Sequence, residues 1–81
     1  MRFTIHTIEE TLFDGEVERI TLPTESGEIT VLDQHQALIT LVTPEVIRMV
    51  SPDGRAETLR LESGGFLEVK PEGEGVILLA V

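Results

Sequence analysis

The sequence predicts an all-β fold, a flattened two-layer β-sandwich or barrel of about 8–10 short, mostly antiparallel strands. No stretch of the chain carries a convincing apolar repeat of the 3.6-residue period that marks an amphipathic helix. Instead, short β-branched segments recur about every ten residues and are separated by Gly, Pro and Asp, the residues that favour turns. With a length of 81 residues and no linker-like segment, residues 1–81 form a single predicted domain.

Eight segments have the composition of strands. They are residues 2–7, 16–22, 28–32, 37–42, 46–51, 56–61, 66–70 and 76–81. In the first segment, Phe3 and Ile5 share one face, which we expect to be buried, and polar residues alternate with them. The segments 37–42 and 76–81 are apolar on both faces, which is typical of central strands or of strands between two layers.

Turn signals separate these segments. Ser51-Pro52-Asp53-Gly54 predicts a hairpin turn, because proline presets φ and glycine supplies the positive φ that follows. Residues 71–75 predict a second turn, while Asp14-Gly15 and Ser26-Gly27 are weaker signals. Ser63-Gly64-Gly65 lacks the lysine and helix of a phosphate loop, so its glycines indicate positive φ, a bulge or a close backbone crossing.

Composition argues against several classes of function. The net charge is −9 and Lys70 is the single lysine, so direct binding to nucleic acid or to anionic membrane surfaces is not expected. The longest apolar run, residues 76–81, is far shorter than the ~20 residues of a spanning helix, so no direct membrane insertion is expected. The acidity suits a basic partner or serves solubility.

The sequence offers weak candidates for chemistry. Asp33, His35 and Ser63 are the residue types of a hydrolase triad, but no nucleophile-elbow pattern surrounds Ser63. Asp33 and His35 also suit metal coordination, yet His6 is the only other histidine and lies on a different predicted strand. We therefore predict no catalytic residue, no metal site and no cofactor, and His35 alone is also compatible with an ordinary loop position.

The order of several segments carries a resemblance to a known family. These segments are LFDGEVERI at 12–20, GEITVL at 27–32, His35, and SGGFLEV at 63–69. In this order and spacing they resemble the N-terminal domain of the ε subunit of bacterial F-type ATP synthase, called δ in mitochondria. The resemblance implies a two-layered β-sandwich at the foot of the central rotor stalk. It implies a non-catalytic subunit at the cytoplasmic face of the bacterial inner membrane, held by the γ subunit and the polar loops of the c-ring.

The resemblance also implies partner-binding residues. Glu28 matches the acidic residue of the family's "GE" turn near the c-ring loops, which makes Ser26, Gly27 and Glu28 candidates for ring contact; a plain acidic turn is the alternative. His35 matches the histidine of the family's "PGHAPL" box, which lies toward γ. Leu38 and Ile39 match the apolar pair that follows it, where core packing is the alternative.

Two departures from the family pattern limit these expectations. The box here reads Asp33-Gln34-His35-Gln36-Ala37, without the usual glycine and second proline, which leaves the γ-contact residues open. Longer members continue into a helical hairpin that inhibits ATP hydrolysis and in some cases binds ATP, whereas this sequence stops at Val81, so neither hairpin inhibition nor ATP binding is expected. A stand-alone acidic β-sandwich adaptor is the alternative function.

Overall fold

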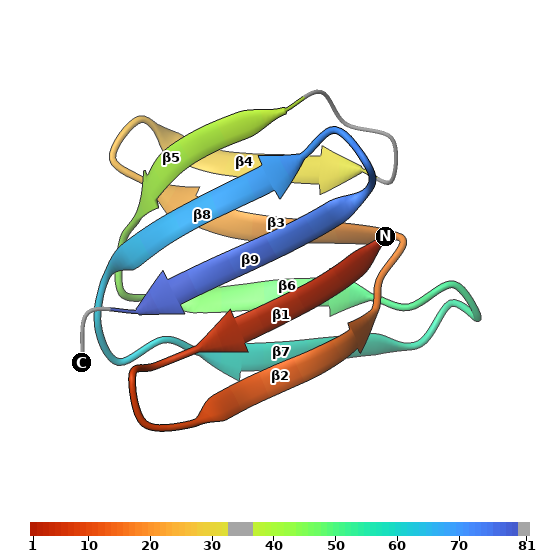
Figure 1. Cartoon of the computed structure of the whole chain (residues 1–81), viewed down its shortest axis with the longest axis horizontal. Coiled ribbons are helices and arrows are strands. Elements are labelled where there is room, and N and C mark those ends of the chain that lie inside the picture. Colours follow the sequence, from red (N-terminus) through yellow and green to blue (C-terminus); the bar gives the residue numbers. More distant parts are fainter. Residues whose placement is uncertain (33–36, 80–81) are drawn as a thin grey trace.

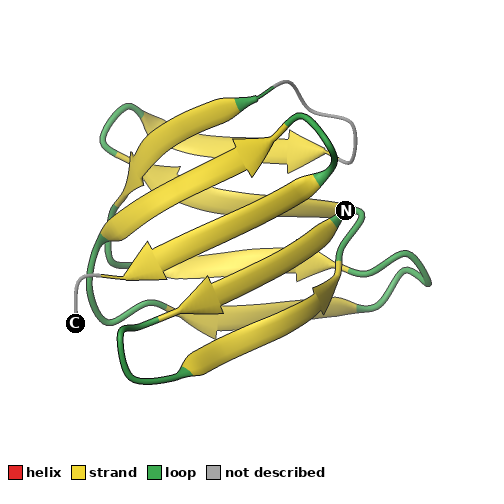
Figure 2. Cartoon of the chain, viewed as in Figure 1, coloured by secondary structure: helices red, strands yellow, loops and turns green. Residues whose placement is uncertain are grey.

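Nine strands make up the regular structure of the part of the chain that the computed structural model describes, residues 1–32 and 37–79. Figure 2 shows these strands joined by short loops, with no helix in the described residues. The strands are Arg2–His6 (β1), Thr11–Glu16 (β2), Arg19–Thr24 (β3), Gly27–Leu32 (β4), Leu38–Val42 (β5), Val46–Val50 (β6), Ala56–Arg60 (β7), Gly65–Lys70 (β8) and Glu74–Leu79 (β9).

The strands form two sheets that face each other (Figure 1). One sheet has five strands in the order β2-β1-β9-β8-β5, and the other has four in the order β4-β3-β6-β7. Neighbouring strands pair antiparallel, except that β1 and β9 run parallel in the middle of the five-stranded sheet. The predicted all-β, two-layer sandwich is confirmed.

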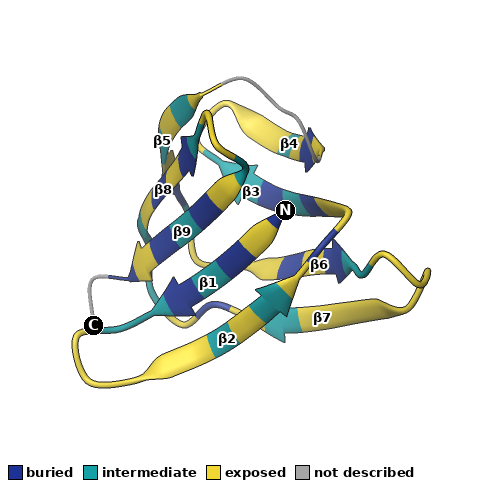
Figure 3. Ribbon diagram, turned by 45° about the vertical axis from the view of Figure 1, so that its right-hand side comes forward, coloured by how far each residue is buried: buried dark blue, intermediate teal, exposed yellow. Residues whose placement is uncertain are grey.

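The core lies between the sheets, because every second residue of each central strand points inward (Figure 3). Phe3 and Ile5 are fully buried, as the alternation in the first segment predicts. Their fully buried neighbours are Val17, Ile20, Leu22, Val31, Ile47, Met49, Leu61, Leu67 and Ile77. Each such large side chain stabilises the fold by about 1.5–3 kcal/mol relative to exposure.

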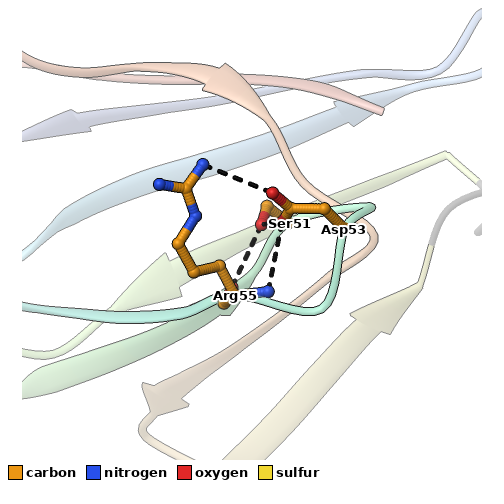
Figure 4. Close-up of polar contacts among 3 residues, drawn as sticks. All are labelled: Ser51, Asp53 and Arg55. Atoms are coloured by element: carbon orange, nitrogen blue, oxygen red, sulfur yellow. Dashed lines mark hydrogen bonds and ion pairs between the residues drawn. The ribbon is translucent and has the colours of Figure 1, made fainter.

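The turn between β6 and β7 is the predicted hairpin turn, with Gly54 at φ 89°. Figure 4 shows how side chains hold it: the Ser51 hydroxyl donates to Asp53 Oδ1, and the Arg55 N–H donates to the same oxygen at 3.2 Å. The Arg55 guanidinium lies 3.4 Å from Asp53 Oδ2. The carboxylate therefore accepts local hydrogen bonds that close the loop.

The predicted turn at residues 71–75 is also confirmed, and it joins β8 to β9. Lys70 pairs with Glu74 at the end of the ladder, and the Gly73 N–H donates to the Lys70 carbonyl at 3.1 Å. Gly73 has a φ of 91°, a conformation that costs little only for glycine. The three-residue loop with its last residue at positive φ is a common hairpin connection.

The predicted strand 16–22 is wrong, because that segment contains the end of one strand and most of another. β2 ends at Glu16 and β3 begins at Arg19, with Val17 buried between them. Asp14 and Gly15, which indicated a turn, lie inside β2 instead. Gly15 is tolerated there because the ring of Phe13 lies over it, 3.3 Å from where a Cβ would be.

The inference that segment 37–42 is a central strand is likewise wrong. β5 is an edge strand of the five-stranded sheet, and its outer residues Ile39 and Leu41 are exposed. The matching inference for residues 76–81 holds for the described part, because β9 lies between β1 and β8. Apolar residues on both faces of β5 thus reflect an apolar outer surface rather than a second covering layer.

Gly64 and Gly65 are required by close contact with neighbouring backbone. A Cβ on Gly64 would lie 2.8 Å from the Val42 carbonyl oxygen, and one on Gly65 would lie 2.1 Å from the Leu78 carbonyl oxygen. The described glycines with positive φ are Gly27, Gly54 and Gly73, so positive φ is not the reason for this pair. Of the roles predicted for the pair, close backbone approach is the correct one.

Candidate partner-binding surfaces

The outer surface of the five-stranded sheet carries exposed apolar side chains from three adjacent strands. Leu41 on β5, Phe66 on β8 and Leu78 on β9 form one row, because Phe66 pairs with Leu41 on one side and with Leu78 on the other. Phe66 is 58% exposed although it is the largest of them. Ile39 and Val76 lie in the next row. We call Ile39, Leu41, Phe66, Val76 and Leu78 the apolar face.

A shallow groove of about 340 Å³ runs over this face. Its lining includes Ile39, Phe66, Val76 and Leu78, and also Glu68, which lies between Ile39 and Val76 in the second row. Large exposed apolar side chains that adjoin one another on a small domain mark a surface that another protein covers. The single charge at the centre would orient that partner through a hydrogen bond or an ion pair.

Sequence reasoning placed the γ contact at His35, Leu38 and Ile39. The structure puts Ile39 on the apolar face, where it is 71% exposed. Leu38 points the other way, pairs with Val69 and packs against the core, which agrees with the packing alternative for this residue. His35 lies outside the described residues.

The predicted c-ring contact, Ser26, Gly27 and Glu28, lies at the turn between β3 and β4. Thr24 shapes this turn: its hydroxyl donates to the Gly27 carbonyl at 2.7 Å and accepts from the Ser26 N–H at 3.2 Å. Gly27 has a φ of 112° and open space around it, so conformation alone requires glycine there. The turn is exposed and presents Glu25 and Glu28 to solvent.

Glu28 has an internal partner that the sequence did not indicate. Its Oε2 lies 3.0 Å from Arg48 Nη2 on β6, and both side chains are 55% exposed. The pair crosses over β3, since Glu28 is opposite Pro23 and Arg48 is opposite Thr21. An external cation that binds Glu28 must therefore compete with Arg48.

The apolar face and the β3–β4 turn lie on different parts of the molecule. The turn adjoins the end of β5, where the Thr43 N–H donates to the Pro23 carbonyl at 3.2 Å. Ile39 is near the start of β5, which runs toward the turn, and Leu41 of the apolar face lies near the end of the same strand (Figure 1). The two surfaces therefore belong to different sheets and come near each other at the end of β5.

The candidates for chemistry gain no support. Asp33 and His35 lie outside the described residues, so their geometry with Ser63 is not defined. Ser63 Oγ is buried without a hydrogen-bond partner in residues 1–32 and 37–79, and His6 Nδ1 lies 3.1 Å from the Thr11 hydroxyl. Over the same residues, no cluster of His, Cys, Asp and Glu is arranged to hold a metal ion. Nor does the described part contain a helix that could span a membrane.

Most of the apolar face was missed by sequence reasoning, which had selected only Ile39. The signal that could have found it is the alternation along each strand. In Phe66-Leu67-Glu68-Val69, Leu67 and Val69 point inward, so Phe66 must point outward although it is apolar. The same holds for Leu78 beside Ile77 and Leu79. Large apolar residues out of phase with the buried set indicate a sheet with a second apolar surface.

Comparison with known proteins identifies the family. Residues 1–80 match the family model described as the β-sandwich domain of the ATP synthase delta/epsilon chain. The chain belongs to this family. Curated relatives in it include the ATP synthase epsilon chain of Chromobacterium violaceum, 39% identical over 71 residues, which are 88% of this chain and 51% of that protein. The epsilon chain of Herminiimonas arsenicoxydans is 38% identical over 77 residues, which are 95% of this chain and 55% of that protein.

Chains in two solved structures of mitochondrial ATP synthases have the same fold. A chain in the cryo-EM structure of the Euglena gracilis mitochondrial ATP synthase, titled OSCP/F1/c-ring in rotational state 1, superposes with a TM-score of 0.86 at 26% identity, covering 98% of this chain and 49% of that one. A chain of the Tetrahymena thermophila mitochondrial ATP synthase central stalk and c-ring gives 0.76 at 19% identity, covering 99% of this chain and 63% of that one, which shows the fold alone. This chain spans about half the length of the curated relatives it matches.

Proposed function

We propose that the protein is a non-catalytic central-stalk subunit of F1Fo ATP synthase, which links ion-driven rotation of the c-ring through γ to ATP synthesis. The observation that carries the proposal is the match of residues 1–80 to the delta/epsilon β-sandwich domain. The apolar face adds support, because a rotor subunit without chemistry of its own needs at least one extensive docking surface. The 26% identical chain from the Euglena synthase structure is consistent with this assembly.

In this proposal the γ subunit covers the apolar face. Removing the exposed Ile39, Phe66 and Leu78 side chains from water would drive the association, and Glu68 would set its orientation. The closely packed core beneath the face resists deformation, so force applied at one surface reaches the other without loss of shape. His35 belongs to the proposed γ contact on the resemblance alone.

The proposed c-ring contact is the β3–β4 turn with Ser26, Gly27 and Glu28. Glu25 and Glu28 are exposed carboxylates that suit basic polar loops, and the glycine fixes the backbone that presents them. The chain would be peripheral, held at the cytoplasmic face of the bacterial inner membrane through these partners. This position requires neither an inserted segment nor a nucleotide site on the sandwich.

Co-purification tests the proposal. A tagged chain expressed with the synthase and solubilised in mild detergent is expected to retain γ and the c-ring through affinity purification. Capture of neither subunit would overturn the rotor assignment, and capture of an unrelated protein through the apolar face would favour the adaptor function. The circular dichroism spectrum of the tagged chain, compared with that of the untagged wild-type chain, establishes that the tagged chain is folded.

A further inference from the structure

The outer surface of the four-stranded sheet differs in charge from the rest of the molecule. Its outward positions, defined by alternation with the buried residues, are Arg19, Thr21, Pro23, Glu28, Thr30, Leu32, Val46, Arg48, Val50, Ala56, Thr58 and Arg60. Three arginines and one glutamate are the charged residues among them. We call Arg19, Arg48, Arg60 and the three threonines the arginine face.

The arginines form a diagonal across three adjacent strands. Arg48 on β6 pairs with Thr21 on β3 and with Thr58 on β7. Arg19 lies two residues from Thr21, and Arg60 lies two residues from Thr58, on opposite sides of Arg48. Diagonal neighbours of this kind are roughly 7–8 Å apart on the sheet, so the three arginine positions are regularly spaced along the backbone.

Two of these arginines are available to a partner. Arg48 holds Glu28, but Arg19 and Arg60 are exposed and have no ion-pair partner among residues 1–32 and 37–79. Thr21 and Thr30 hydrogen-bond to each other at 3.0 Å beside Arg48, on the side toward β4. The face thus offers guanidinium donors on a rigid sheet rather than on loops.

The setting of the face restricts what it binds. The protein has 6 lysines and arginines in total and a net charge of −9, so half of its basic side chains lie on this one surface. Carboxylates surround it at the strand ends: Glu18, Glu25, Glu45 and Glu62. An extended polyanion such as nucleic acid, or an anionic membrane, would be repelled by this rim. A second copy would bring a second net charge of −9.

We propose that the arginine face docks a short acidic segment of a partner protein, with carboxylates on alternate residues of an extended strand. Such carboxylates lie roughly 6.6–6.8 Å apart, close to the spacing of the arginines. Arginine binds carboxylates with two parallel hydrogen bonds, which gives the contact direction as well as charge. The threonine hydroxyls supply further donors between them. The proposal is independent of the rotor assignment, since it rests on the charge pattern of this sheet alone.

A nuclear magnetic resonance titration of the isotopically labelled chain tests it. The probe is a capped heptapeptide with glutamate at its second, fourth and sixth positions and Ser or Thr elsewhere, and the control peptide carries glutamine in place of glutamate. At low ionic strength the glutamate peptide is expected to shift amides of β3, β6 and β7, and these shifts are expected to disappear at about 0.5 M salt, where the Debye length is only a few ångströms.

Variants locate the contact. Arg19→Glu and Arg60→Glu are each expected to weaken peptide binding about threefold or more, because each charge reversal removes an ion pair and adds a repulsion between carboxylates. Arg55→Glu is the matched control, since Arg55 is exposed in the β6–β7 turn, off this face, and its reversal is expected to leave binding unchanged. Amide spectra of all three variants report whether each is folded.

Several results would overturn the proposal. These are absence of shifts on the face, an equal response to the glutamine peptide, or equal weakening by Arg55→Glu. An oligonucleotide of the same charge that binds equally well would reject the carboxylate class. Concentration-dependent shifts of the chain alone, on the same residues, would assign the face to self-association instead.

Discussion

The ring of Phe3 on β1 lies directly over Gly75 on β9, so that a Cβ on Gly75 would come within 2.6 Å of two ring carbons. The two residues are register partners in the parallel β1–β9 pair. Both are buried, and Phe3 has no exposed surface at all. A missing side chain on the last strand therefore makes room for the largest core residue of the first.

Gly75→Ala is expected to destabilise the protein by about 1–3 kcal/mol, because the added methyl group overpacks the core beneath the Phe3 ring. Urea unfolding measures the effect. The double variant Gly75→Ala with Phe3→Leu should lose less unfolding free energy than the sum of the two single variants, since the smaller side chain removes part of the clash. Strict additivity would mean that the two residues do not interact.

Gly65→Ala is expected to cost about 3 kcal/mol or to prevent folding, because its Cβ would meet the Leu78 carbonyl oxygen at 2.1 Å. Backbone of a paired strand cannot move away as a flexible side chain can. Gly27→Ala is the comparison: nothing lies near its Cβ, so only the φ of 112° opposes it, at about 1 kcal/mol. Thermal unfolding of the two variants should show this order, and the reverse order would refute the steric explanation.

Phe66→Ser and Ile39→Ser are expected to reduce γ capture by tenfold or more, on the order of the 1.4 kcal/mol that a buried contact at an interface supplies. Their stability should change by less than about 0.5 kcal/mol, since both side chains are exposed in the isolated chain. Ile8→Ser is the matched control, because Ile8 is 81% exposed but lies in the β1–β2 turn. If Ile8→Ser weakens capture equally, the apolar face is not the γ site.

Asp53 gives the β6–β7 turn a dependence on pH. The hydrogen bond from the Ser51 hydroxyl, followed by that from the Arg55 N–H, lowers the pKa of Asp53 below its ordinary 3.8. The folded state therefore releases this proton more readily than the unfolded state does. The resulting stabilisation is complete above the unfolded pKa and is lost as pH falls through the folded pKa.

The stability difference between the wild-type chain and Asp53→Asn should accordingly shrink as the pH is lowered from about 5 to 3. Chemical denaturation at several pH values measures it. In Ser51→Ala the pKa of Asp53, followed by carboxyl carbon resonances, should rise toward its ordinary value because the principal donor is gone. An unchanged titration would show that Ser51 does not stabilise the carboxylate.

Arg48→Ala is expected to strengthen c-ring retention, because it releases Glu28 from its internal ion pair. Glu28→Gln should weaken retention in the same assay, with Glu72→Gln in the β8–β9 turn as the control. Both Glu28 and Arg48 are half-exposed, so their pair contributes at most about 1 kcal/mol to stability and less in salt. If Arg48→Ala and Glu28→Gln change c-ring retention in the same direction, Arg48 does not compete with the c-ring for Glu28.

The strands with clear alternation could be predicted from sequence, and β2 could not. In β1 the apolar residues Phe3 and Ile5 alternate with polar ones, and both are buried. β2 contains Asp14 and Gly15, which favour turns in isolation, and pairing with β1 overrides that preference. Its Gly15 is accommodated by the Phe13 ring, a contact that the sequence does not specify.

Sequence reasoning could select single residues of the candidate surfaces, but not the groups of residues that the fold brings together. The resemblance selected Ile39 as a candidate, whereas Phe66 and Leu78 join it on the surface only because β5, β8 and β9 are neighbours in one sheet. The order of strands depends on pairing between distant segments, which local periodicity does not encode. The Glu28–Arg48 pair was missed for the same reason, since it links residues 20 positions apart across an intervening strand.

The parallel pairing of β1 with β9 has a consequence for biosynthesis. β9 fills the gap between β1 and β8, so the five-stranded sheet exists as two separate fragments until residues 74–79 have left the ribosome. Before β9 is made, β1 can pair with β2 and β5 can pair with β8, but the strand that joins these two pairs is missing. Folding of this sheet is therefore completed only after translation of β9, and until then the edge of β1 that pairs with β9 is unpaired.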